Sequence, residues 1–66
     1  MYEPESLYII TKKVRGFNYY WNIERNRWDG WKNNIKPILG ENVPKHFSAA
    51  VKMGYGTEDV VVKKID

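Results

Sequence analysis

Aromatic and arginine side chains gather in one short stretch, residues 18–31, which reads NYYWNIERNRWDGW and holds all three tryptophans of the 66-residue chain. Such residues could stack on nucleic-acid bases while guanidinium groups neutralise phosphates, or they could anchor a protein–protein contact. They could also simply fill the core of a domain this small. Which of these holds for each side chain depends on the strands and turns that position it.

The second predicted strand of the chain has the clearest alternation of apolar and polar residues. In residues 18–24, Tyr19, Trp21 and Ile23 alternate with Tyr20, Asn22 and Glu24, which predicts a strand with an apolar face and a polar, exposed face. The alternation therefore assigns Trp21 to the core.

The strand before it is predicted over residues 7–14, LYIITKKV, which are β-branched and aromatic. Tyr8, Ile10 and Val14 share one face. Lys12 interrupts that face, so we expect the strand to leave the core there. Arg15 and Gly16 then form a turn, because glycine adopts positive φ without cost.

A second turn and a third strand follow. The polar segment ERNR favours a tight turn in which Asn26 takes the left-handed conformation. Residues 27–31 are expected to form the third strand. Trp28 is expected to lean towards the core, whereas Trp31, beside Gly30 at a strand end, is expected to be the most exposed tryptophan.

The second half of the chain contains one helix candidate. Residues 32–42 are expected to be a loop with a short edge strand, since Pro37 and Gly40 argue against a central one. The helix is predicted over residues 43–53, with Asn42 as N-cap and Pro44 in the first turn. Helical spacing predicts an apolar face of Val43, Phe47, Ala50, Val51 and Gly54.

The helix is expected to end at Gly54 or Gly56. After it, the three valines at positions 60–62 predict a strand buried on both faces at its start, in the interior of the sheet. The predicted fold is α+β, a small antiparallel sheet of three to four strands with one helix packed on one face, in the order β-β-(β)-α-β. Residues 1–66 form a single domain, with residues 1–6 as a frayed leader.

Five segments together, YII, YYWNI, RW, FSAAVKMGYG and DVVVKKI, give a pattern of element order and aromatic placement that resembles short phage and prophage proteins of this ββ(β)αβ type. Most such proteins have no established activity. The resemblance implies a phage-like accessory protein and brings no site residues with it.

Residues that usually perform catalysis are scarce. The chain has no cysteine and a single histidine, His46, which lacks a carboxylate at a suitable spacing and is expected to be exposed on the helix. The glutamates and aspartates do not form a pair in contrasting environments, and no phosphate-binding glycine loop is present. We therefore expect no enzyme activity, no cofactor and no metal site.

Four residues remain as candidates for binding once the core positions are removed: Tyr20, Arg25, Arg27 and Trp31. Tyrosine, tryptophan and arginine are enriched in protein interface hot spots. A nucleic-acid-binding hairpin is the alternative, and the element order also resembles the three-stranded DNA-binding modules of phage-type integrases. Glu24 on the exposed face would repel phosphate, however, and the net charge is only +3.

The expected partner is accordingly a host or phage protein ahead of nucleic acid, and a homodimer stays open. No apolar run is long enough for a membrane span, and the N-terminal residues lack the pattern of a signal peptide. These features predict a soluble protein of the host cytoplasm without membrane contact, and the absence of cysteine agrees with a reducing compartment.

Overall fold

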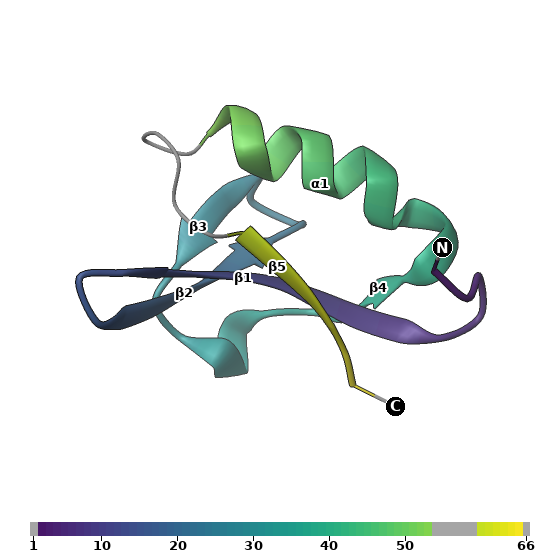
Figure 1. Ribbon diagram of the computed structural model, residues 1–66, viewed down its shortest axis with the longest axis horizontal. Coiled ribbons are helices and arrows are strands. Elements are labelled where there is room, and N and C mark those ends of the chain that lie inside the picture. Colours follow the sequence, from purple (N-terminus) through teal and green to yellow (C-terminus); the bar gives the residue numbers. More distant parts are fainter. Residues whose placement is uncertain (1, 54–59, 66) are drawn as a thin grey trace.

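One antiparallel sheet and one helix make up the structure (Figure 1), a computed structural model that describes residues 2–53 and 60–65. The strands are β1 (Leu7–Val14), β2 (Phe17–Asn22), β3 (Arg27–Asp29), β4 (Ile38–Leu39) and β5 (Val60–Lys64). The helix is α1 (Val43–Lys52), and single 3-10 turns form at η1 (Lys32–Asn34) and η2 (Gly40–Asn42). The predicted α+β fold is confirmed, and β4 is the short strand expected within residues 32–42.

Strand β1 is the centre of the sheet, because β2, β4 and β5 all pair with it. Tyr8 pairs with both β4 and β5, and Thr11 pairs with both β2 and β5. A residue has one neighbour on each side, so β2 and β4 share one edge of β1 and β5 occupies the other. The prediction of an interior position for the last strand is therefore wrong, since β5 lies at the edge of the described sheet.

Both hairpin turns follow the turn chemistry predicted from the sequence. Arg15 and Gly16 have φ values of 51° and 86° between Val14 and Phe17, which is the two-residue type I′ geometry. Asn26 also has a positive φ of 51° in the turn between β2 and β3. These turns fix the register that pairs Thr11 with Tyr20 and Trp21 with Trp28.

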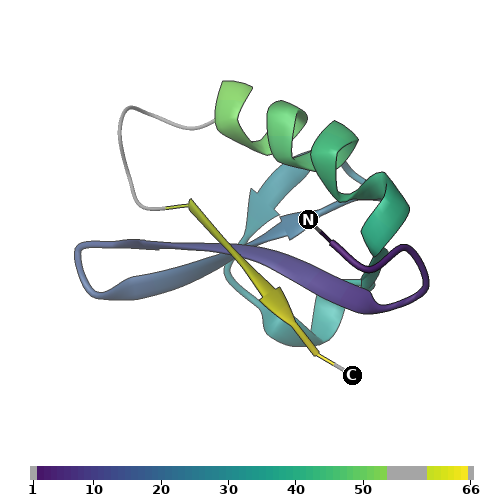
Figure 2. The ribbon, with the colours of Figure 1, turned by 45° about the vertical axis from the view of Figure 1, so that its right-hand side comes forward.

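The core lies between the sheet and α1, which covers one face of the sheet in Figures 1 and 2. Trp21 is fully buried there, as predicted. The buried apolar cluster takes residues from three strands and the helix: Tyr8, Ile10, Trp21, Ile38, Val43 and Ala50. The apolar faces of the helix and the sheet are thus buried against each other, as the amphipathic patterns predict.

The helix departs from its prediction in two ways. Asn42 precedes α1 but makes no side-chain capping bond, because it has helical dihedral angles (φ −98°, ψ −5°) as the last residue of η2. Val51, predicted on the apolar face, is exposed. The predicted helix ends at Gly54 or Gly56 lie outside the described residues.

Three burial predictions for the strands are wrong. Lys12 does not mark an exit from the core, since it is only 6% exposed. Asn22, placed on the exposed face by alternation, is only 3% exposed. Val61 is 45% exposed rather than buried, because β5 lies at an edge and this valine points away from the helix side.

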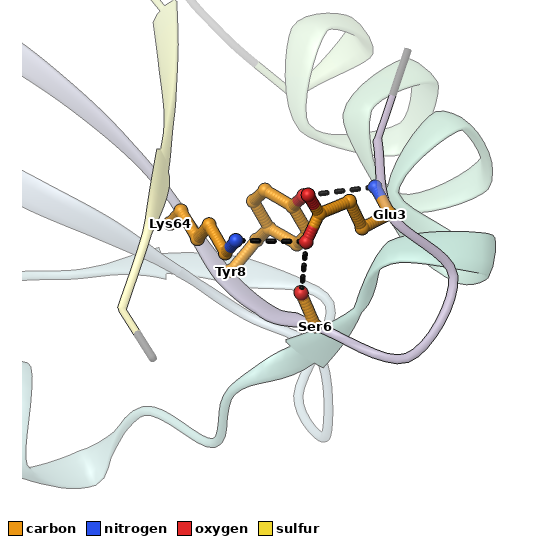
Figure 3. Close-up of polar contacts among 4 residues, drawn as sticks. All are labelled: Glu3, Ser6, Tyr8 and Lys64. Atoms are coloured by element: carbon orange, nitrogen blue, oxygen red, sulfur yellow. Dashed lines mark hydrogen bonds and ion pairs between the residues drawn. The ribbon is translucent and has the colours of Figure 1, made fainter.

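The N-terminal segment, residues 2–6, which the sequence predicts to be part of a frayed leader, makes hydrogen bonds to β1 and β5 (Figure 3). The backbone N–H of Glu3 donates to the Tyr8 hydroxyl at 2.9 Å, and Ser6 Oγ and Lys64 Nζ each donate to Glu3 Oε2 at 2.7 Å. The hydrogen bonds from Lys64, foremost, and from Ser6 lower the pKa of the Glu3 carboxyl. Gly40 lies so close to this segment that a Cβ at position 40 would overlap the backbone carbonyl of Glu3.

Candidate binding surface on the first two hairpins

The register of β2 and β3 decides which predicted site residues lie together. Tyr20 pairs with Asp29, and Asn22 pairs with Arg27. Directly paired residues point to the same side of a sheet, and Trp21 between them faces the core, so these four side chains lie on the face opposite α1. Tyr20 is half-buried and Arg27 is exposed on this face.

Trp31 is the most solvent-exposed of the three tryptophans, as predicted, with 72% of its surface accessible. Its backbone N–H donates to Asp29 Oδ1 at 3.0 Å, in a side-chain turn that ends β3. The same aspartate is therefore the strand partner of Tyr20 and the anchor of Trp31.

The other two tryptophans belong to the core side. Trp21 and Trp28 meet edge to face, with ring centroids 5.4 Å apart. Trp28 Nε1 donates to the Ala50 carbonyl at 3.1 Å, which ties β3 to α1. Lys12 Nζ lies 4.4 Å from the centroid of the Trp28 ring, so a cation–π contact explains why this lysine is buried. Both tryptophans stabilise the fold, so neither belongs to the candidate binding surface.

A polar hollow lies at the β2–β3 turn. It is lined by Asn22, Glu24, Arg25, Asp29 and Asn34. Asn22 Oδ1 accepts the backbone N–H groups of Glu24 and Arg25, at 3.0 and 3.1 Å, which shapes the turn. The Lys36 ammonium lies 3.2 Å from Glu24 Oε2. Arg25 in the hollow and Lys36 beside it thus lie close to the carboxylates of Glu24 and Asp29, so the polar hollow has no net positive charge.

A second hollow lies beside the β1–β2 hairpin, and we call it the aromatic notch. It is lined by Gly16, Phe17, Asn18, Tyr19, Tyr20 and Gly30 and has a volume of about 450 Å³. Phe17 is 68% exposed there. Figures 1 and 2 show this hairpin projecting beyond the rest of the sheet.

The structure places the four predicted residues around Asp29 without bringing them into one hollow. Arg25 lines the polar hollow, Tyr20 lines the aromatic notch, and Arg27 and Trp31 line neither. Sequence reasoning missed Phe17, because it precedes the alternating pattern, and also Asp29, because an aspartate before glycine is an ordinary turn residue. A phenylalanine directly after the predicted Arg15–Gly16 turn is the sequence signal that could have added Phe17 to the candidates.

The ionisable side chains that line the hollows are Glu24, Arg25 and Asp29 in the polar hollow and Tyr19 and Tyr20 in the aromatic notch. His46 lines neither of them, and it is half-buried on α1 rather than exposed as expected; burial, and then the nearby Lys45 ammonium, lower its pKa. Across residues 2–53 and 60–65, no group of three histidine, aspartate or glutamate side chains could hold a metal ion. In the same residues, no helix has the length and apolar character needed to cross a membrane.

Comparison with protein-family models finds no match for this chain, and neither curated proteins nor solved structures give one.

Proposed function

We propose that this protein is a non-catalytic binding module that acts by occupying the surface of another protein, as a phage-like accessory protein would. The observation that carries the proposal is the pair of large aromatic side chains, Phe17 and Trp31, exposed on the first two hairpins. Exposed aromatic residues beside arginine are the usual anchors of protein interfaces. The partner we favour is a host or phage protein in the host cytoplasm.

The charge around the arginines supports a protein partner. Arg25 shares the polar hollow with Glu24 and Asp29, and Lys36 pairs with Glu24. A phosphate backbone would meet carboxylates as well as guanidinium groups there, which weakens nucleic-acid binding. A protein surface with mixed charges would find complementary groups in the same place.

Nucleic-acid binding is the second candidate, and the aromatic notch is what favours it. Lys13 and Arg15 are exposed near Phe17, and a base could stack on that ring. The same residues also suit an acidic protein surface.

The test is affinity capture from a bacterial lysate with three forms of the protein. We expect the unmodified protein and a Val51→Ala control, which removes an exposed side chain of α1, to capture the same protein. A Phe17→Ala, Trp31→Ala double variant should lose it. Labelled single- and double-stranded DNA is titrated in parallel at about 50 and about 200 mM salt. Tight, salt-sensitive DNA binding, with no protein that depends on Phe17 and Trp31, would overturn the proposal.

A further inference from the structure

Strand β3 covers only half of its neighbour. Its last residue, Asp29, pairs with Tyr20, and the chain then turns away at Trp31, whose N–H is held by the Asp29 carboxylate. The described part of β3 has no residue opposite Asn18. The aromatic notch is the space that a longer β3 would occupy.

The backbone of Asn18 points into this space. In a two-residue hairpin the residues flanking the turn, Val14 and Phe17, exchange backbone hydrogen bonds, and such pairs alternate along an antiparallel ladder. Phe17 and Tyr19 therefore direct their N–H and C=O groups at β1, whereas Asn18 directs its groups away from it. An N–H and a C=O displayed in this way are the template that a further strand uses.

Side chains on both faces of the sheet would contact such a strand. Phe17 and Tyr19 lie on the helix side of β2, and Tyr20 lies on the other side. Gly30 leaves the end of β3 clear, since a Cβ there would have no atom within 4 Å. An added segment would thus have backbone partners in its plane and aromatic rings above and below it.

The charge of the first hairpin selects the kind of segment. Residues 7–22 contain Lys12, Lys13 and Arg15 and no aspartate or glutamate. Lys12 is buried against Trp28, but Lys13 and Arg15 are exposed, and Lys13 pairs directly with Asn18. A second copy of this hairpin would bring like charges together, whereas an acidic strand would find complementary ones.

We propose that the aromatic notch binds an extended, acidic segment of the partner protein, which adds to the sheet as a short strand along Asn18. Its acidic side chains would lie on the face of Lys13, and its alternate apolar side chains would contact Phe17 and Tyr19. This inference rests on the proposed protein-binding function and names the chemistry of the partner.

The probe is a fluorescein-labelled peptide of about six residues in which valine and glutamate alternate, the length of a typical strand. A valine–lysine peptide and a single-stranded oligothymidylate serve as comparisons. We expect the glutamate peptide to bind, and to bind at least tenfold more weakly to Asn18→Pro, which lacks the edge N–H, and to Lys13→Glu. The matched Asn18→Ala variant retains the N–H and should bind within about twofold of the unmodified protein.

Amide NMR on the unmodified protein gives an independent readout that does not depend on how a proline variant folds. The Asn18 N–H should shift and exchange more slowly with solvent when the glutamate peptide is added. No change at Asn18, equal binding of both peptides, or preference for the oligothymidylate would overturn the inference. If the captured partner still depended on Phe17 and Trp31 in that case, the proposed function would stand without it.

Discussion

The contact between the Lys12 ammonium and the Trp28 ring explains a buried charge, and a double-mutant cycle measures its contribution to stability. The two changes are Lys12→Leu and Trp28→Leu, made singly and together. Leucine is preferred to methionine at position 12 because a thioether would make its own attraction to the ring. The cycle isolates the pair from the other contacts of each residue.

The expected coupling follows from distance and burial. Lys12 Nζ is 4.4 Å from the ring centroid, and the side chain is 6% exposed, so water screens the contact little. A largely desolvated cation–π contact contributes about 1–2 kcal/mol. Trp28→Leu alone should cost more, about 2–4 kcal/mol, because it also removes the Nε1 hydrogen bond to Ala50 and leaves a smaller side chain.

Urea unfolding followed by far-UV circular dichroism gives the four free energies of unfolding, since tryptophan fluorescence would change with the substitution itself. Domains of this size have a free energy of unfolding of roughly 3–10 kcal/mol in total. An osmolyte at one fixed concentration is therefore added to all four samples, so that each is folded before urea is added. A coupling free energy near zero would refute the reasoning. The charge of Lys12 would then be tolerated by the core for a reason other than Trp28.

Three further outcomes are expected. Gly16→Ala should lower the free energy of unfolding by about 1–2 kcal/mol in the same urea assay, because Gly16 has a φ of 86°; an unchanged midpoint would contradict the type I′ turn. Asn22→Ala should cost about 1–3 kcal/mol, since a buried acceptor of two N–H groups is lost, and an Asn22→Asp control, which keeps the acceptor, should cost less. Burial, and then Lys45, lower the pKa of His46 below its ordinary 6.5, so the unfolded chain takes up this proton first, and stability that is complete above pH 6.5 should fall as the pH drops through the folded pKa. NMR titration of His46 measures that pKa directly, and His46→Gln should remove this part of the pH dependence of unfolding; a pKa at or above 6.5 would contradict the burial.

Features set by neighbouring residues could be predicted from the sequence. The alternation of Tyr19 and Trp21, and the positive φ of Gly16 and Asn26, depend on local spacing and on backbone sterics. The burial of Lys12 could not be predicted from the sequence, because it depends on contact with Trp28, which belongs to another strand. Local patterns cannot show which ring will lie above a cation.

The position of β5 shows the same limit. Its valines favour a buried strand, yet the sharing of one β1 edge by β2 and β4 leaves β5 at the other edge with Val61 exposed. Likewise, Tyr20 and Trp31 could be selected as candidates by residue type. The aromatic notch could not, because it exists only where β3 stops short of Asn18.

The central position of β1 has a consequence for how the chain reaches this structure. The strand near the start of the chain must pair with one near its end, and the Glu3–Lys64 contact spans 61 residues. Closing a loop of that length carries an entropic cost before any contact offsets it, which slows folding relative to a domain of the same size whose contacts are mostly local. On the ribosome, one side of β1 stays unpaired until β5 has left the exit tunnel, so the nascent chain exposes a strand edge that the finished protein covers.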